Sequence, residues 1–348
     1  MTQDVLSRVD GRVGVLSLNR PKAIHALTLP MVHAMTDALV KWRDDPAIEA
    51  VIVDHAEGRG FCAGGDIAFL RNSAVNDGGE SGRRFFHDEY RLNHLMFTYP
   101  KPIVAFMDGI TMGGGVGISL PATFRVATEN TRLAMPETGI GLFPDVGGGW
   151  YLSRLKGRLG QYLALTGARL NGAECLWAGM ATHYLAPDAL ADAKSRIAGA
   201  PDVIAAALRE LSAVPPEPKI AAQAHEIERL FGSDDYEAIL SMLEADGGEW
   251  AAQQLRTLAT KSPQTCKVAL RQLHGSLSLT DFAENMRHEY RIASRVLVRP
   301  DFAEGVRALI VDKTNDPHWN PATAEGVTSE LLDAIFAPLP ANEEWTPL

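Results

Sequence analysis

Glu137 and Asp145 stand out by type and setting, because both are isolated acids in an apolar, glycine-rich stretch. The stretch runs from Gly109 to Gly149 and reads GITMGGGVGISLPATFRVATENTRLAMPETGIGLFPDVGGG. Carboxylates in apolar surroundings tend to have raised pKa values, which suits proton transfer or attack on a carbonyl. Each acid also has a simpler interpretation: Glu137 could lie on a solvated loop, and Asp145 could cap the helix that follows it. Spacing alone does not show that the two acids face one substrate.

Two glycine-rich loops could supply hydrogen-bond donors to a single oxyanion. One contains Gly113-Gly114-Gly115 and the other contains Ala63-Gly64-Gly65-Asp66. Each loop follows a predicted strand and opens a predicted helix, so each could offer one backbone N–H to the same carbonyl oxygen. Taken alone, the triple glycine could merely let a helix pack closely on a strand. Asp66 is most simply the N-cap of the helix that follows it.

Two further residues near these motifs carry chemically useful groups. Cys62 lies inside the first glycine loop, but no partner histidine is identifiable nearby, so it is interpreted as a small packing residue. Glu89, in the sequence FHDEY, would by default be one more charge on an exposed helix face.

The motifs that the sequence lacks narrow the chemistry. It contains no G-x-S-x-G nucleophile elbow, no Walker A sequence and no H-E-x-x-H pair. The dinucleotide-binding spacing G-x-G-x-x-G is not satisfied either, because the sixth position from Gly115 and Gly117 is Leu120. Serine hydrolases, nucleotide hydrolases, zinc hydrolases and dinucleotide dehydrogenases are therefore disfavoured, and we expect no metal and no redox cofactor.

The composition is that of a globular protein and disfavours a polyanionic partner. The chain has 348 residues, which is long enough for one large domain or two ordinary ones. Of these residues, 46% are hydrophobic and 22% are charged. With 33 basic and 43 acidic residues its formal charge is −10, so we expect neither nucleic acid nor a membrane as a partner. The charge-free run 109–124 is too short for a membrane span, which needs about 20 mostly apolar residues.

Cysteine usage points to a reducing compartment. Cys62, Cys175 and Cys266 are far apart and odd in number, which fits neither a disulfide framework nor a paired-cysteine zinc site. No apolar signal-peptide core is visible near the N-terminus. We expect a cytoplasmic protein, with the mature form of an organellar protein as the alternative.

Short apolar segments alternate with helical periodicity over the first part of the chain, which indicates an α/β class. Strands are predicted at 13–18, 50–53, 103–107, 123–127 and 132–135. Helices are predicted at 30–43 with Thr28 as its cap, from 67, at 84–97 and at 113–120.

Beyond about residue 187 the strand signal disappears and only helical periodicity follows. The sequence VPPEP at 214–218 is the best linker candidate in the chain. We predict an α/β core over residues 1–200 that contains the active site, followed by a helical region over residues 201–348.

Several motifs together resemble the crotonase (enoyl-CoA hydratase/isomerase) superfamily. They are NRPKA at 19–23, FCAGGDI at 61–67, the triple glycine at 113–115 and Pro136-Glu137. The stretches ITMGGGVG, MPETGIGLFPDVGGG, LALTGARL and DFAEGVRALIVDK look like the subgroup that hydrolyses 3-hydroxyisobutyryl-CoA. The resemblance covers nearly the whole chain, from about residue 10 to about residue 320, and it is far more specific than a single glycine signature.

The resemblance implies a spiral of ββα units followed by α-helices, and it assigns roles to residues. It implies that the amides of Gly65 and Gly114 form the oxyanion hole for a CoA thioester carbonyl. Glu137 matches a catalytic glutamate, Asp145 matches the second catalytic acid of the subgroup, and Glu89 matches a substrate-contacting glutamate. The substrate is thus expected to meet Glu89, Gly114, Glu137 and Asp145.

The main departure from the hydratases of the superfamily is Gly117. They carry a glutamate there and use it, with the one at Glu137, to add water across a double bond. A glycine can neither orient water nor protonate carbon, so hydratase activity is disfavoured and hydrolysis is favoured. Some isomerases also use an acid at the position of Asp145, which keeps isomerisation as the alternative.

The resemblance therefore implies hydrolysis of 3-hydroxyisobutyryl-CoA to 3-hydroxyisobutyrate and CoA, a step of valine breakdown. CoA is part of the substrate, so no separate cofactor is expected, and its phosphates should meet Lys or Arg side chains that spacing does not identify. A non-enzymatic crotonase-like protein that contacts RNA is the alternative from another class, disfavoured by the net charge. Crotonases are often trimers or hexamers, which leaves a homo-oligomer open because the longer helical tail could alter that assembly.

Overall fold

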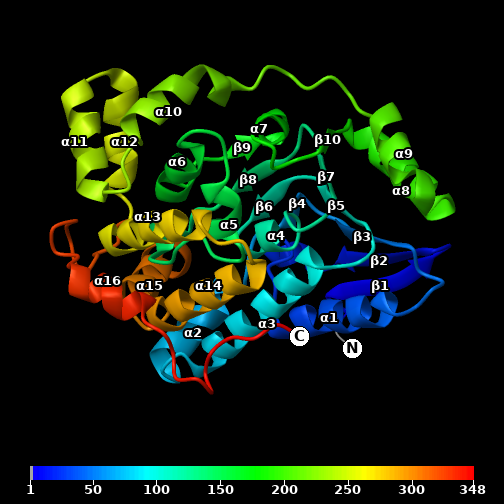
Figure 1. Ribbon diagram of the computed structural model, residues 1–348, viewed down its shortest axis with the longest axis horizontal. Coiled ribbons are helices and arrows are strands. Elements are labelled where there is room, and N and C mark those ends of the chain that lie inside the picture. Colours follow the sequence, from blue (N-terminus) through cyan, green and yellow to red (C-terminus); the bar gives the residue numbers. More distant parts are fainter. Residues whose placement is uncertain (1–2) are drawn as a thin grey trace.

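The computed structural model describes residues 3–348, and its first layer is a six-stranded sheet (Figure 1). The strand order is β1-β2-β3-β5-β7-β10, with β1 antiparallel to β2 and every other neighbouring pair parallel. The strands are β1 (Val5–Asp10), β2 (Val13–Leu18), β3 (Ala50–His55), β5 (Ile103–Met107), β7 (Phe124–Ala127) and β10 (His183–Tyr184).

A second, smaller sheet is made of short strands that follow strands of the first. It has the order β4-β6-β8-β9, in which β4, β6 and β8 are parallel and β9 is antiparallel to β8. Its strands are β4 (Gly60–Cys62), β6 (Ile110–Met112), β8 (Arg132–Ala134) and β9 (Leu170–Asn171). The pairs β3–β4, β5–β6 and β7–β8 each lead into a helix or helical turn, so the chain repeats a ββα unit.

This repeat places three loops at one edge of the second sheet. Because β4, β6 and β8 are parallel neighbours, the loops that leave their carboxyl ends lie next to one another. Those loops carry both glycine motifs and Glu137. The architecture confirms the predicted α/β class with a ββα spiral and C-terminal helices.

The helices of the first half surround the two sheets. They are α1 (Leu29–Arg43), α2 (Ile67–Asn76), α3 (Glu80–Phe97), α4 (Gly114–Gly117), α5 (Gly148–Ser153), α6 (Leu159–Thr166) and α7 (Gly172–Trp177). Short helical turns occur at five places along the chain: η1 (Pro21–Ala23), η2 (Glu137–Ile140), η3 (Pro187–Ala189), η4 (Pro201–Val203) and η5 (Lys219–Gln223).

The second half is helical among the described residues beyond β10. Its helices are α8 (Leu190–Gly199), α9 (Ile204–Glu210), α10 (Ala224–Leu230), α11 (Tyr236–Asp246), α12 (Glu249–Leu258), α13 (Pro263–Leu277), α14 (Phe282–Val296), α15 (Pro300–Val306) and α16 (Ser329–Phe336), with a π turn η6 (Arg307–Val311) after α15. No helix within residues 3–348 is long and apolar enough to cross a membrane.

Most predicted elements are present. Thr28 caps α1 by accepting a hydrogen bond from the amide of Met31 at 3.4 Å, and Asp66 caps α2 by accepting one from Phe69 at 3.2 Å. The helix predicted at 113–120 is wrong in length, because α4 ends at Gly117.

Five strands were not predicted, for two physical reasons. The strands β4, β6, β9 and β10 have only two or three residues each, too few to show a period of two. In contrast, β1 has six residues, but it is an edge strand whose side chains are exposed after Val5, so it shows no apolar alternation.

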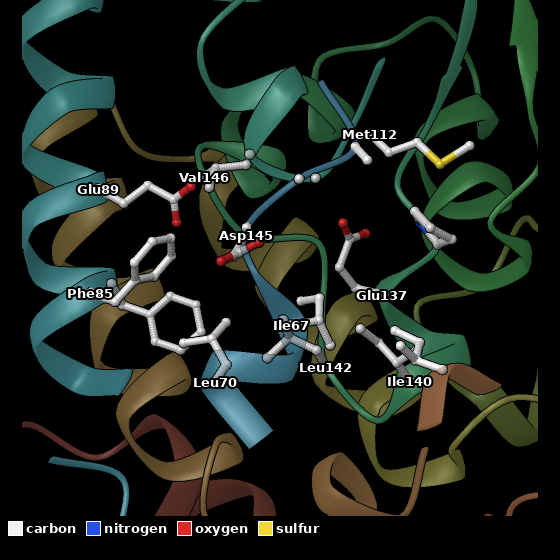
Figure 2. Close-up of a pocket in the computed structure, with 18 residues that line it drawn as sticks. Ile67, Leu70, Phe85, Glu89, Met112, Glu137, Ile140, Leu142, Asp145 and Val146 are labelled. Atoms are coloured by element: carbon white, nitrogen blue, oxygen red, sulfur yellow. The ribbon is translucent and has the colours of Figure 1, made fainter. Parts of the chain in front are cut away.

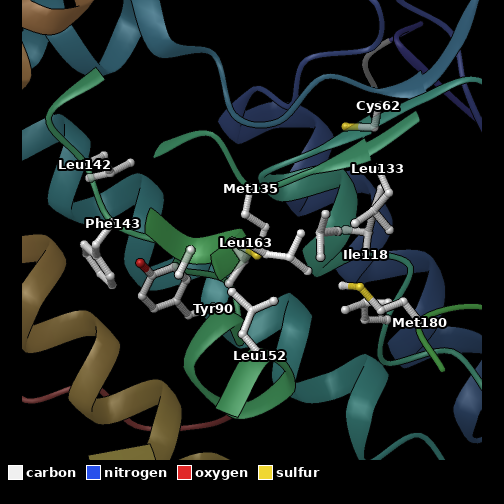
Figure 3. Packing of buried hydrophobic residues seen from close by; sticks show 14 of the residues in the cluster. Cys62, Tyr90, Ile118, Leu133, Met135, Leu142, Phe143, Leu152, Leu163 and Met180 are labelled. Carbon is white, nitrogen blue, oxygen red and sulfur yellow. The ribbon is translucent and has the colours of Figure 1, made fainter. Parts of the chain in front are cut away.

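Two buried clusters hold the layers together. One lies between the first sheet and the helices α8 and α9, and includes Val15, Ile52, Val104, Ile197 and Leu208. The other is much larger and continues through both sheets, α1, α3 and the C-terminal helices. Figure 3 shows part of it.

The predicted division at residue 200 falls between α8 and α9, which pack on each other. Residues 213–218 form neither helix nor strand, and they lead to the remaining C-terminal helices. The large cluster includes residues on both sides of that segment. The two-part division itself stays a prediction.

The C-terminal segment packs against α3. The indole of Trp345 is fully buried, its Nε1 donates to the carbonyl of His87 at 3.0 Å, and its ring meets the edge of His94 with a centroid distance of 5.8 Å. Both partners lie on the helix that carries Glu89.

We predict that Trp345→Ala lowers the free energy of unfolding by about 3–5 kcal/mol, because it opens a large cavity in the core. Urea denaturation measures the change. Leu348→Ala is the matched control, since that side chain is 60% exposed, and it should change stability by no more than about 0.5 kcal/mol. A Trp345→Ala protein as stable as the parent would show that the segment does not contribute to the core.

Candidate active site

One pocket brings together the five residues singled out from the sequence (Figure 2). Its volume is about 150 Å³, and it is lined by Gly65, Gly114, Glu89, Glu137 and Asp145. The rest of the lining is mainly apolar and comes from α2, α3, the strand ends and the π turn η6. These apolar residues are Ala63, Ile67, Leu70, Phe85, Phe86, Met112, Pro136, Ile140, Leu142, Val146 and Ile310.

The two glycine loops meet beside this pocket. The segment after η1 pairs with the first loop: Leu27 N donates to Gly64 O at 2.7 Å, and Asp66 N donates to Leu27 O at 2.9 Å. This pairing leaves the amide of Gly65 unused. Within residues 3–348, neither this amide nor that of Gly114 donates a hydrogen bond to another protein group. Two unpaired backbone donors at one pocket could serve a carbonyl oxygen.

Close packing requires glycine in the second loop. Gly113 has a φ of +48°, a conformation that favours glycine. A Cβ on Gly114 would lie 2.6 Å from Oε1 of Glu89. The triple glycine therefore does let backbone approach other groups closely, and one of those groups is a carboxyl of the pocket.

Glu137 begins η2, three residues after the last residue of β8. Its side chain is only 5% exposed, and its Oε2 has no hydrogen-bond partner among the described residues. Burial, and secondarily the charge of Asp145, raises the pKa of Glu137 well above its usual value. The solvated-loop interpretation is therefore wrong.

Asp145 lies on the segment between η2 and α5 and is 4% exposed. Its Oδ2 accepts a hydrogen bond from the hydroxyl of Tyr90 at 2.8 Å. Burial raises the pKa of Asp145 to about 7, although the hydrogen bond from Tyr90 opposes this shift. The side chain does not cap α5: the N-cap residue is Gly147, the amide of Gly148 donates to the backbone carbonyl of Asp145, and the amides of Gly147 and Gly149 donate to Glu289. The Asp145 carboxyl is thus directed to the pocket.

Glu89 is buried, contrary to the exposed position assumed by default. It lies on α3, which is packed between α1, α2 and α14, and it is 2% exposed. Its Oε1 has no partner within residues 3–348. Burial, followed by the charge of Asp145, raises the pKa of Glu89 well above its usual value. The pocket thus holds three carboxyls that burial biases toward the neutral form.

Sequence reasoning missed three residues that shape this pocket. Tyr90 donates to Asp145, Val146 follows it with a φ of +53°, and Glu289 anchors the next turn. Tyr90 adjoins Glu89 in the sequence, which could have drawn attention to it. Glu289 is 144 residues away from Asp145, and no local signal connects the two.

The structure also bears on a cysteine nucleophile and on a metal site. Cys62 is fully buried and burial raises its pKa to about 12, which fits the interpretation as a packing residue. The described part of the chain contains no group of three or more His, Cys, Asp or Glu side chains that could hold a metal ion.

Gly117 faces packed side chains and does not line the pocket. A Cβ built on it would lie 2.6 Å from Cβ of Val146 and 2.9 Å from Nδ2 of Asn93. A glutamate at this position would need both neighbours to move. The local packing therefore matches the glycine, and not a second catalytic acid.

Comparisons with known proteins agree with this geometry. The family model for enoyl-CoA hydratase/isomerase matches residues 13–336. A curated relative from Xenopus tropicalis, named 3-hydroxyisobutyryl-CoA hydrolase, mitochondrial, is 43% identical over 94% of this chain and 87% of its own length. The human protein of the same name is 40% identical over 98% of this chain and 90% of its own length.

A solved structure has nearly the same fold over the whole chain. It is described as a carnitinyl-CoA dehydratase from Mycobacterium thermoresistibile and has a TM-score of 0.93, with 41% identity and 99% coverage of both chains. The family match, these relatives and the ββα spiral together show that the chain belongs to the enoyl-CoA hydratase/isomerase family.

Proposed function

We propose that this protein hydrolyses the thioester of 3-hydroxyisobutyryl-CoA, giving 3-hydroxyisobutyrate and CoA in valine breakdown. The observation that carries the proposal is the convergence of Glu137, Asp145 and two unpaired glycine amides on one pocket. The names of the curated relatives support the choice of substrate.

The glycine amides would act on the thioester carbonyl. Gly65 and Gly114 would donate to its oxygen and stabilise the tetrahedral oxyanion as negative charge develops there. Preorganised donors of this kind typically contribute on the order of 10²–10³ in rate each. The apolar lining would exclude bulk water and strengthen these hydrogen bonds.

The three buried carboxyls would divide the proton transfers. Because one buried carboxylate disfavours ionisation of its neighbours, an ionised group and a protonated group can coexist at neutral pH. In its ionised form Glu137 would either take a proton from the attacking water or attack the carbonyl itself to form an anhydride. In both routes the C–S bond breaks and CoA leaves as the thiolate, which takes up the proton released from water; in the second route water then hydrolyses the anhydride and regenerates Glu137. Asp145 would orient the substrate hydroxyl or share proton transfer, and Glu89 would help to recognise that hydroxyl.

A hydratase or isomerase of the same family is the second candidate, because the solved relative is described as a dehydratase. The packing around Gly117 argues against water addition, since no second acid occupies that position. An RNA-binding role is disfavoured by the formal charge of −10.

Three expectations stay predictions. The first is that the enzyme needs no separate cofactor, because CoA is part of the substrate. A homo-oligomer remains open. Cytoplasmic residence is proposed from cysteine usage, whereas the names of both curated relatives carry the word mitochondrial.

Thiol release separates the two candidate functions directly. We expect rapid CoA release from 3-hydroxyisobutyryl-CoA and 3-hydroxypropionyl-CoA, measured with a thiol-reactive dye, and none from crotonyl-CoA. Loss of enoyl absorbance from crotonyl-CoA without thiol release would instead establish a hydratase. A salt-dependent gel shift with RNA would support the binding-protein alternative.

Glu137→Gln should lower kcat for CoA release by about 10²–10⁴-fold, because an amide can neither accept the proton nor attack the carbonyl. The affinity for the CoA ester should stay close to that of the parent, since the side chain keeps its shape. Steady-state kinetics and calorimetric binding measure the two effects. Near-normal turnover would exclude Glu137 from catalysis.

Asp145→Asn should impair hydrolysis and also stabilise the fold at pH 8. The pKa of Asp145 is raised from 3.8 to about 7 in the folded protein, so the native state binds more protons than the unfolded state between these values. The carboxyl therefore costs stability as pH rises toward 7, and a neutral amide removes that cost.

Thermal unfolding of both proteins at pH 5 and pH 8 measures this effect. The advantage of Asp145→Asn should be largest at pH 8 and should shrink at pH 5. A variant that is less stable than the parent at pH 8 would indicate that Asp145 has a structural role instead.

A further inference from the structure

Glu289 is a buried carboxyl that the proposed chemistry does not use. It lies on α14 in the C-terminal helical part, and its side chain is fully buried. Its Oε2 accepts a hydrogen bond from the amide of Gly147 at 2.7 Å. Its Oε1 accepts from the amide of Gly149 at 3.0 Å, from Asn285 Nδ2 at 2.9 Å and from Gln272 Nε2 at 3.1 Å.

These bonds reach the backbone on both sides of Asp145. Gly147 and Gly149 follow Asp145 by two and four residues. On the other side, the Nε2 that donates to Glu289 also donates to the carbonyl of Pro144 at 2.8 Å. Glu289 and Gln272, from α14 and α13, therefore hold the segment 144–149 at three backbone positions.

The segment needs support from outside itself. Val146 has a φ of +53°, which β-branched residues rarely adopt. A strained backbone of this kind persists where the surrounding structure over-determines it. The conformation turns Asp145 toward the hydroxyl of Tyr90, 2.8 Å away. Within residues 3–348, the backbone carbonyl of Asp145 accepts one backbone hydrogen bond outside regular helices and strands, from the amide of Gly148 at 2.7 Å.

The chemistry of the four donors fits a carboxylate. All four are N–H groups, so each needs an acceptor, and the two carboxyl oxygens of Glu289 supply them. Burial raises the pKa of Glu289 to about 8, and the donors from Gly147 and Asn285 oppose that shift. A glutamine would present an NH2 group to one of these N–H donors, so at least one backbone hydrogen bond would be lost.

We infer that Glu289 is a positioning residue for hydrolysis, which together with Gln272 fixes the backbone around Asp145 and thereby holds its carboxyl against Tyr90 in the pocket. The inference rests on the proposed function for its catalytic consequence, but the positioning itself does not depend on that function. It makes the C-terminal helices a structural part of the active site. Within residues 3–348, none of the hydrogen-bond partners of Glu289 lines the pocket, so its effect passes through the segment 144–149.

Hydrogen exchange of the full chain tests the positioning without any substrate. In Glu289→Gln, at least one of the amides of Gly147 and Gly149 should exchange about tenfold faster or more, because an NH2 group replaces its acceptor oxygen. The matched control is Glu284→Gln, on the same helix and away from the pocket, and it should leave both amides unchanged. Unaltered exchange at both glycines in a folded Glu289→Gln protein would overturn the inference.

Kinetics test whether the effect passes through Asp145. Glu289→Gln should lower kcat for 3-hydroxyisobutyryl-CoA about tenfold or more with KM little changed, if about 1.4 kcal/mol or more of positioning is lost. In the Asp145→Asn background the same substitution should change kcat by less than about twofold, because residues acting as one unit are non-additive. Effects that multiply would contradict positioning through Asp145.

Failure of the proposed function and misfolding of Glu289→Gln each have a separate readout. If the parent releases no CoA, the proposed function fails, while the exchange result still decides the positioning. If Glu289→Gln does not fold, Gln272→Met removes the hydrogen bonds to Pro144 and Glu289 at similar volume, and it should show the same pattern in both assays. A folded Gln272→Met protein with parental exchange and kcat would overturn the inference.

Discussion

Desolvation of three carboxyl groups in one small apolar pocket is the constraint that shapes the rest of the site. Glu89, Glu137 and Asp145 are each no more than 5% exposed, and none of the described residues that line the pocket is a lysine or arginine. With no cation in this lining, burial raises the pKa values of the three carboxyls and favours the protonated form of most of them. The site therefore combines weak acids with unpaired amides, which suits acyl transfer at neutral pH.

Placing these groups depends on two different parts of the fold. The parallel order of β4, β6 and β8 gathers the glycine loops and Glu137 at one edge, as parallel pairing requires. Asp145 lies beyond this edge, on a segment with a strained residue, and is held from α13 and α14. The helical half thus contributes to the geometry of the pocket as well as covering the core.

Sequence patterns predicted the elements whose signal is local. The strand at 13–18, the helix capped by Thr28 and the glycine loops depend on neighbouring residues, and the structure contains them. The short strands of the second sheet have no periodicity to detect. The burial of Glu89 follows from helices that are distant in sequence, so composition around it suggested an exposed charge. Glu289 was missed for the same reason, because only tertiary packing brings it to the Asp145 segment.

The central claim is that burial keeps the Asp145 carboxyl protonated up to about pH 7. Infrared difference spectroscopy measures this protonation state most directly. The carboxyl signal of Asp145 is obtained by subtracting the spectrum of Asp145→Asn from that of the parent over a pH titration. The account predicts a protonated carboxylic acid whose signal is lost around pH 7. A carboxylate signal already complete at about pH 5, as for an ordinary solvated aspartate, would contradict it.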